Sequence, residues 1–178
     1  TDTRVLNLGG CTGFMVDGNY LFTAKHCLNG LGNTITFKSK KDPNKKIEAK
    51  LIYVTKYADG PIVYFLPSDG DKPYKSFKMA KGAPEIGELV HTVGYPGGNY
   101  AVTYGKVSGG NGVDVNYVKM RISPGNSGGP LVNEKDEIVG VAQAVDTELT
   151  SNNSYFGGWG ITKRALDEAK RSKGVKKE

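Results

Sequence analysis

Short runs of alternating apolar and polar residues, separated by turn residues, fill most of the chain. In the first half they predict a hairpin over 11–24 and further strands at 4–8, 33–38, 46–55 and 61–66. The hairpin turns at Asp17-Gly18-Asn19, a sequence typical of the tight turns that join antiparallel strands. These strands are enough to close a small barrel.

The same pattern returns in the second half, after a connecting segment. Residues 67–84 are rich in proline, glycine, aspartate and lysine and predict a linker, with a short strand at 76–80. Alternating runs then predict strands at 88–94, 101–108, 112–122, 129–133, 137–145 and 154–161. From Thr162 the pattern becomes helical, with Thr162 as a candidate N-cap and Gly174 as a stop.

These elements predict an all-β fold of two antiparallel six-stranded β-barrels with a C-terminal α-helix. We expect an N-terminal barrel over 1–75, a second barrel over 76–161, and the helix with a basic tail over 162–178. The 178 residues include 25 glycines, which agrees with many short strands joined by tight turns. The chain begins at Thr1 without an initiator methionine or signal peptide, so we expect a mature product or a cut piece.

The loop around Ser127 is the first candidate site. It reads Ile122-Ser123-Pro124-Gly125-Asn126-Ser127-Gly128-Gly129-Pro130-Leu131, with three glycines around one serine. Glycine allows backbone angles closed to other residues and close approach of another chain. A hydroxyl exposed there could attack a substrate carbonyl while N–H groups bind the carbonyl oxygen, as in acyl transfer. The same residues also suit a plain tight turn, so a partner base is needed.

Two histidines are available as that base. His26 follows the apolar run Leu21-Phe22-Thr23-Ala24, which places its imidazole at the end of a strand. His91 lies within an alternating run at 89–94, where a surface-facing strand residue is the better interpretation, and we assign it no chemistry.

Two segments resemble the histidine and serine signatures of the chymotrypsin-like serine proteases: Thr23-Ala24-Lys25-His26-Cys27 and Gly125-Asn126-Ser127-Gly128-Gly129-Pro130. Two further segments strengthen the likeness to bacterial glutamyl endopeptidases and high-temperature-requirement proteases: Val93-Gly94-Tyr95-Pro96-Gly97-Gly98 and Gly105-Lys106-Val107-Ser108-Gly109. Small viral polyprotein proteases share this fold. The resemblance implies peptide-bond hydrolysis through a Ser-His-Asp triad and an acyl-enzyme, with no metal or cofactor. It also implies an oxyanion hole formed by the N–H groups of Gly125 and Ser127.

The acid of such a triad must lie between His26 and Ser127 and orient the imidazole. Asp59 is the best candidate, because residues 57–66 resemble the family's aspartate followed by an apolar strand, although Gly60-Pro61 intervenes here. Asp69 and Asp71 are alternatives in what looks like a solvated turn.

The separation of Cys11 and Cys27 matches the disulfide that flanks the catalytic histidine in this family. A bridge would close a loop of about 15 residues, worth roughly 3 kcal/mol, and would imply an oxidising compartment. We therefore expect a secreted, extracellular protein. The alternative is a pair of free, buried cysteines in a viral polyprotein product inside the host cell.

Residues before Ser127 and on the strand after it should line the substrate pocket: Arg121, Ile122, Gln143, Ala144 and Val145. Arg121 would favour an acidic residue before the scissile bond if its side chain turns into the pocket, and is a strand charge if it turns outward. Ala142 stands where Glu- or Gln-selective families usually carry a histidine, which counts against an acidic preference. The ends Thr1 and Glu178 would instead suit a fragment released by its own Glu-selective cuts.

The formal net charge of +6 comes mainly from lysines at 38–46 and in the C-terminal tail. Aromatic residues are not interleaved with those lysines, so a solvated surface is favoured over a nucleic-acid groove. We expect protein or peptide substrates, neither nucleic acid nor a membrane as a partner, and a monomer. The rival hypothesis is a catalytically silent protease-fold module that binds a partner through its basic surface.

Overall fold

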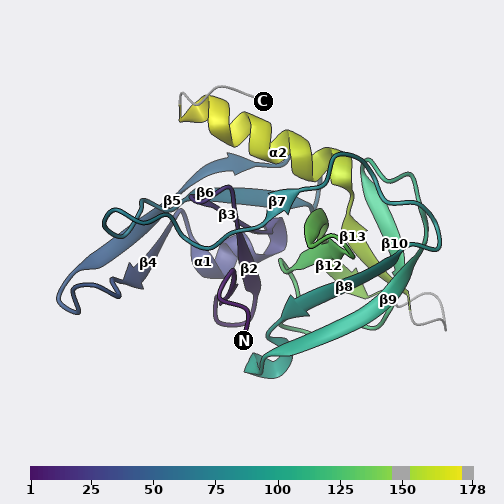
Figure 1. Ribbon diagram of the computed structural model, residues 1–178, viewed down its shortest axis with the longest axis horizontal. Coiled ribbons are helices and arrows are strands. Elements are labelled where there is room, and N and C mark those ends of the chain that lie inside the picture. Colours follow the sequence, from purple (N-terminus) through teal and green to yellow (C-terminus); the bar gives the residue numbers. More distant parts are fainter. Residues whose placement is uncertain (146–152, 174–178) are drawn as a thin grey trace.

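An open six-stranded sheet forms the first half of the molecule (Figure 1). The computed structural model describes residues 1–145 and 153–173. The strand order is β1-β2-β3-β6-β5-β4. No pairing joins β1 to β4 in the described part of the chain, so this sheet is a half barrel. Its strands are β1 (Val5–Asn7), β2 (Thr12–Val16), β3 (Tyr20–Ala24), β4 (Thr34–Lys38), β5 (Lys46–Val54) and β6 (Pro61–Phe65).

The second sheet closes on itself. Its order β11-β8-β9-β10-β13-β12 returns to β11 through a β11–β12 pairing, and β7 adds to β12 in parallel. The strands are β7 (Lys78–Met79), β8 (Leu89–Gly94), β9 (Ala101–Gly110), β10 (Val115–Lys119), β11 (Pro130–Asn133), β12 (Glu137–Val145) and β13 (Asn153–Gly157). The expected all-β, chymotrypsin-like fold with a C-terminal helix is confirmed. Of the two expected barrels, the second closes and the first is a half barrel within the described residues.

One apolar core joins the two sheets. Phe14 and Phe22 of the first sheet belong to the same buried cluster as Val93 and Val141 of the second. Every residue of β2 and β3 is buried, because one face of these strands fills the half barrel and the other packs against the closed barrel. Their nearly continuous apolar runs, unlike the alternation of β4, reflect burial on both faces.

Helix α2 (Trp159–Ser172) begins earlier than expected from the sequence. Its N-cap is Gly158, so the predicted N-cap at Thr162 is wrong; the Thr162 hydroxyl instead donates to the Gly158 carbonyl within the helix, at 2.7 Å. The predicted strand at 154–161 correspondingly ends at Gly157. A Cβ on Gly158 would lie 2.6 Å from the Val113 carbonyl oxygen, so the chain turns where its backbone packs closely on another segment. The predicted stop at Gly174 lies outside the described residues.

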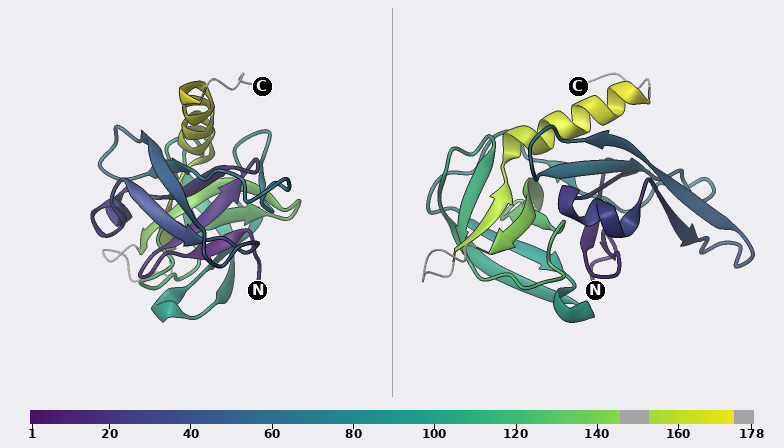
Figure 2. Two further views of the ribbon diagram at one scale, coloured as in Figure 1. Left: turned by 90° about the vertical axis from the view of Figure 1, so that its left-hand side faces the viewer. Right: turned by 180° about the vertical axis from the view of Figure 1, so that it is seen from behind.

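Helix α2 packs on strands of both sheets, namely β5, β6 and β12 (Figure 2). Its buried residues Ala165, Leu166 and Ala169 complete the shared core. The other helical elements are a short helix and two 3-10 turns that the sequence pattern did not indicate: α1 (Leu28–Leu31), η1 (Lys25–Cys27) and η2 (Pro96–Gly98). Among the described residues, no helix has the length and apolar character needed to cross a membrane.

Candidate active site

His26 and Asp59 lie against each other at one end of the first sheet. His26 sits in η1, directly after β3, and Asp59 precedes β6, the neighbour of β3. The His26 Nδ1 is 2.9 Å from Asp59 Oδ2, and the His26 backbone N–H donates to Asp59 Oδ1 at 3.2 Å. Since both carboxylate oxygens contact His26, the ring is oriented with Nδ1 on the acid and Nε2 facing away from it.

This pairing shifts the pKa of both groups. The hydrogen bond to Asp59 raises the pKa of His26 above its ordinary value of 6.5, against a smaller opposing effect of burial. Burial raises the pKa of Asp59, but hydrogen bonds from His26 and from the Gly60 N–H outweigh it and hold that pKa below 3.8. The side chains are 44% and 30% exposed, so solvent screens part of the attraction. Asp59 therefore stays ionised at neutral pH and stabilises a proton on His26.

Lys25 fixes the loop that carries Asp59, a role that the sequence analysis missed. Its backbone N–H donates to the Gly60 carbonyl at 2.8 Å. Its Nζ donates to the carbonyl oxygens of Thr55 at 3.1 Å and Tyr57 at 2.8 Å. Gly60-Pro61, which departs from the family pattern, does not prevent the contact between Asp59 and His26, since Pro61 simply begins β6. A lysine before a histidine carries no local signal of such distant backbone partners.

The other candidate acids and the second histidine lie elsewhere. Asp69 accepts hydrogen bonds from the Ser39 hydroxyl at 2.8 Å and the Lys40 N–H at 2.9 Å. Within the described ranges, no hydrogen bond or ion pair joins Asp69 or Asp71 to His26. His91 lies on β8 beside Tyr104, with ring centroids 5.5 Å apart, and burial lowers its pKa.

The loop that leads to Ser127 holds two N–H groups that have no hydrogen-bond partner among the described residues. The Pro124 carbonyl accepts from the Gly97 N–H at 3.0 Å, and the Asn126 carbonyl accepts from the Gly129 N–H at 2.9 Å. In a trans peptide the N–H points opposite to the carbonyl, so the N–H groups of Gly125 and Ser127 point away from these contacts. Neither donates a hydrogen bond to another described residue. Two such unpaired donors beside a serine can stabilise an oxyanion.

Two glycines make this loop conformation accessible. Gly125 and Gly128 have φ angles of 105° and 88°, in the region that favours glycine. A Cβ on Gly125 would collide with the Tyr95 carbonyl oxygen, and one on Gly128 would collide with the Thr23 hydroxyl. The loop therefore needs glycine both for its backbone angles and for close approach to neighbouring segments.

The Ser127 hydroxyl donates to the backbone carbonyl of Gln143, at 3.2 Å. In the described structure no hydrogen bond joins Ser127 Oγ to His26. The β12–β13 register shifts between Ala142 and Ala144, so Gln143 is the extra residue of a bulge whose carbonyl meets Ser127. The hydroxyl must therefore release the Gln143 carbonyl before it can donate to the imidazole.

The expected pocket residues are only partly brought together. Gln143 is half-buried and contacts Ser127 through its carbonyl, and Ile122 is buried in the core of the closed barrel. Arg121 is exposed, and its guanidinium makes no ion pair with any residue that the structure describes. Ala144 and Val145 belong to β12, but their side chains lie outside the described part of the structure.

Cys11 and Cys27 form a disulfide, as expected, with their Cα atoms 6.4 Å apart. The bridge ties the start of β2 to the residue after His26. The two sulfurs and a ring nitrogen of His26 lie within 4.8 Å of one another. Sulfurs in a disulfide lack the thiolate that a zinc site requires, so this cluster does not fit a metal.

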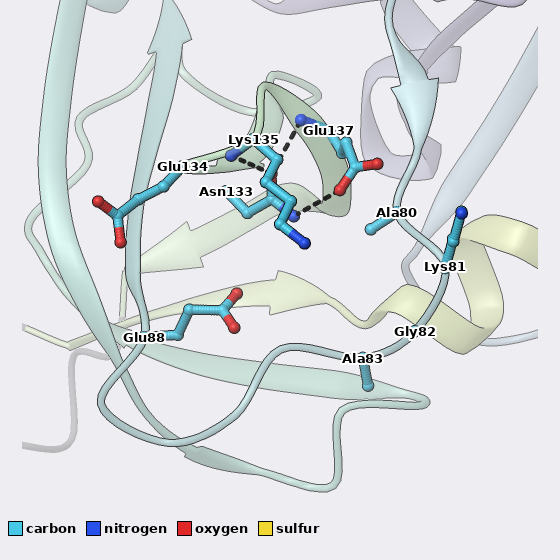
Figure 3. A pocket seen from close by; sticks show the side chains of 9 residues that line it. All are labelled: Ala80, Lys81, Gly82, Ala83, Glu88, Asn133, Glu134, Lys135 and Glu137. Atoms are coloured by element: carbon cyan, nitrogen blue, oxygen red, sulfur yellow. Dashed lines mark hydrogen bonds between the residues drawn. The ribbon is translucent and has the colours of Figure 1, made fainter.

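A cavity of about 540 Å³ lies between segment 80–88 and the turn from β11 to β12 (Figure 3). Its charged side chains include Glu88, Glu134 and Lys135. The Asn133 side chain accepts from the N–H groups of Lys135 and Glu137 and donates to the Glu137 carboxylate. That amide is thus used within the turn, and none of the candidate catalytic residues lines the cavity.

The sequence matches a known family, described as the trypsin-like peptidase domain, over residues 11–141. This range includes His26, Asp59 and Ser127. The chain belongs to the trypsin-like peptidases. It is therefore a serine protease domain by family.

Two curated relatives are longer proteins. The trypsin-like chain is 33% identical to a probable periplasmic serine endoprotease, DegP-like, of Ectopseudomonas mendocina, over 82% of this chain and 31% of that protein. It is 29% identical to the chloroplastic Protease Do-like 2 of Arabidopsis thaliana, over 80% of this chain and 25% of that protein. The chain thus spans about a third or less of the length of these relatives.

Solved structures share the trypsin-like fold. The serine endoprotease from Yersinia pestis superposes with a TM-score of 0.71 at 22% identity, covering 90% of this chain and 57% of that one. An inactive form of Rv3671c from Mycobacterium tuberculosis, a serine-to-alanine mutant, superposes with a TM-score of 0.70 at 20% identity, covering 97% and 87%. At these identities the likeness establishes the fold alone.

Proposed function

We propose that this trypsin-like domain is a serine endopeptidase whose triad consists of Ser127, His26 and Asp59. The main support is the contact between an ionised Asp59 and the Nδ1 of His26, at 2.9 Å, which leaves the other ring nitrogen free to act as a base. The N–H groups of Gly125 and Ser127, which donate to no described residue, support an oxyanion hole at these two positions.

In the proposed reaction, the Ser127 hydroxyl turns from the Gln143 carbonyl to His26 Nε2. His26 takes the proton as Oγ attacks the peptide carbonyl carbon, and the N–H groups of Gly125 and Ser127 bind the resulting oxyanion. The intermediate then collapses, and His26 passes its proton to the leaving amine. Water, activated by the same histidine, hydrolyses the acyl-enzyme and restores the serine.

We further propose that Arg121 selects an acidic residue before the scissile bond. Its exposed guanidinium makes no ion pair with a described residue, so it can pair with a substrate carboxylate. Replacing Arg121 by alanine should remove a preference for Asp and Glu in a peptide library. Lys119→Ala removes the same charge from an exposed position on β10 and serves as the matched control.

We also propose that the domain works in an exported, oxidising compartment. The Cys11–Cys27 disulfide supports this, because such bonds persist outside the reducing cytosol. One relative is named as a probable periplasmic protease. Non-reducing mass spectrometry of the native protein should find the two cysteines joined, and free thiols would contradict the proposal.

Labelling with a fluorophosphonate and profiling of peptide cleavage test the enzymatic proposal. The wild type should label at Ser127 and cleave peptides, and Ser127→Ala should do neither. Among described groups, the Ser127 hydroxyl hydrogen-bonds only to the Gln143 carbonyl, so this variant should unfold at nearly the wild-type temperature. A folded wild type that neither labels nor cleaves would favour the rival hypothesis, a silent module that binds through its basic surface.

A further inference from the structure

Thr12 links the first sheet to the loop that precedes Ser127. It is fully buried and follows Cys11 at the start of β2. Its backbone N–H donates to the Ser127 carbonyl at 2.8 Å, and its own carbonyl accepts from the Thr23 hydroxyl at 2.8 Å. The backbone of Thr12 is thereby fixed on both sides.

The Thr12 side chain makes two more contacts with this region. Its hydroxyl donates to the Gly125 carbonyl at 2.6 Å and accepts from the Tyr95 N–H at 3.1 Å. The donor and acceptor assignments are forced, because a carbonyl can only accept, a backbone N–H can only donate, and a hydroxyl carries one proton. One side chain thus joins the Ser127 loop to the segment after β8.

The Gly125 carbonyl belongs to the peptide that lies between the two candidate oxyanion donors. The Asn126 N–H at the other end of this peptide donates to the Ser123 carbonyl at 3.0 Å. The peptides before and after it are held by hydrogen bonds that the Pro124 and Asn126 carbonyls accept. Without the Thr12 hydroxyl, the middle peptide would be held among described groups by the Asn126 N–H alone, and the geometry that relates the N–H groups of Gly125 and Ser127 would loosen.

We propose that the Thr12 hydroxyl is a positioning residue for the oxyanion hole. This inference rests on the proposed serine endopeptidase function. Thr12 acts through the Gly125 peptide and touches no reacting atom. Its contribution should therefore be largest in the transition state, where negative charge develops on the substrate oxygen, and small in the binding of substrate.

Steady-state kinetics of Thr12→Val and Thr12→Ser test this role. Valine keeps the shape but removes the hydroxyl, which leaves the Gly125 carbonyl and the Tyr95 N–H without their partner. We expect kcat to fall about 10- to 100-fold, part of the loss seen when an oxyanion donor is removed, with KM changed by less than about twofold. Thr12→Ser should restore kcat to within about threefold of the wild type. Binding of a peptide aldehyde, whose adduct places an oxyanion in the hole, should weaken in parallel with kcat.

Two matched controls separate positioning from stability. Thr162→Val removes a buried hydroxyl that bonds within α2, and Thr92→Val removes one with no hydrogen-bond partner in the described structure. Both should keep the wild-type kcat at temperatures where they are folded. If Thr12→Val does not fold, Thr12→Ala replaces it. Alanine leaves room for a bridging water, so kcat should fall by less than the loss expected for valine.

The outcomes distinguish this inference from the proposed function. A wild type that neither labels nor cleaves peptides would refute the function and the positioning role together. An active wild type with Thr12→Val equally active would refute the positioning role alone. The positioning role would also be refuted if kcat fell in both Thr162→Val and Thr12→Val, and fell in each only as much as the melting temperature did.

Discussion

The histidine and serine sides of the site are held by different kinds of contact. On the histidine side, two half-exposed side chains meet directly, and both lie just outside strands of the first sheet, His26 after β3 and Asp59 before β6. On the serine side, Gly125, Asn126, Gly128 and Gly129 are buried, and the loop is held through backbone groups. Its partners come from both sheets, including Thr12 of β2 and Ala142 of β12.

Because of this difference, substitutions on the two sides should change different properties, namely the reaction rate and the stability of the fold. A charged pair near solvent contributes little to folding but sets the protonation of the base. A buried loop of glycines contributes no proton chemistry, yet its conformation admits few other residues. Substitutions of the charged pair on the histidine side should therefore mainly lower the rate, and substitutions of the buried glycines on the serine side should mainly lower stability.

Asp59→Asn should have the largest effect on the rate among substitutions that leave the nucleophile and the base in place. The amide keeps the size of the side chain but stabilises neither the required tautomer nor the imidazolium, and kcat should fall about 10⁴-fold. The melting temperature should change by no more than a few degrees, since the pair is partly exposed. Peptide hydrolysis and calorimetry check both expectations, and a large loss of stability would remove the contrast between the two sides.

Gly128→Ala should have the largest effect on stability. Its φ of 88° is strained for alanine, and the new Cβ would collide with Thr23 and Thr12. Overpacking and strain together should lower the free energy of unfolding by about 3–5 kcal/mol in a urea titration. Gly30→Ala, in α1 with open space around the new Cβ, is the control and should be at least as stable as the wild type, because alanine favours the helix over glycine.

Removing the disulfide should lower stability without changing either side of the folded site, although the bridge joins the residue before Thr12 to the residue after His26. The double variant Cys11→Ala/Cys27→Ala should lose about 3 kcal/mol of unfolding free energy, largely through the unfolded chain. The folded fraction should retain peptide cleavage. Complete inactivity of a folded double variant would show that the bridge also positions the catalytic groups.

The pH dependence of kcat/KM should report the His26–Asp59 contact. The base must be neutral to accept the serine proton, so the rate should fall as pH decreases through the pKa of His26. Because Asp59 raises that pKa, the midpoint should lie above 6.5. In Asp59→Asn the midpoint should move to lower pH, and an unchanged midpoint would contradict the assignment.

Local sequence patterns were sufficient for features that depend on neighbours in the chain. The strands follow from alternation and glycine turns, and His26 and Ser127 stand out because each ends or interrupts an apolar run. The contact between Thr12 and Gly125 could not be predicted, since it joins residues 113 positions apart through a backbone carbonyl. The start of α2 was missed for a similar reason, because Gly158 packs on Val113 in another segment.

The smallest effect is expected from replacing Lys25, whose side chain bonds to backbone carbonyls on the histidine side. Lys25→Met keeps the aliphatic stem and removes the hydrogen bonds to the Thr55 and Tyr57 carbonyls, so stability should fall by about 1 kcal/mol. The looser Asp59 loop should lower kcat a few-fold, whereas Lys56→Met at an exposed position should change neither. If Lys25→Met also leaves stability and kcat unchanged, the histidine side depends on the His26–Asp59 pair alone. The contrast with the serine loop, which is held by backbone hydrogen bonds, would then be greater.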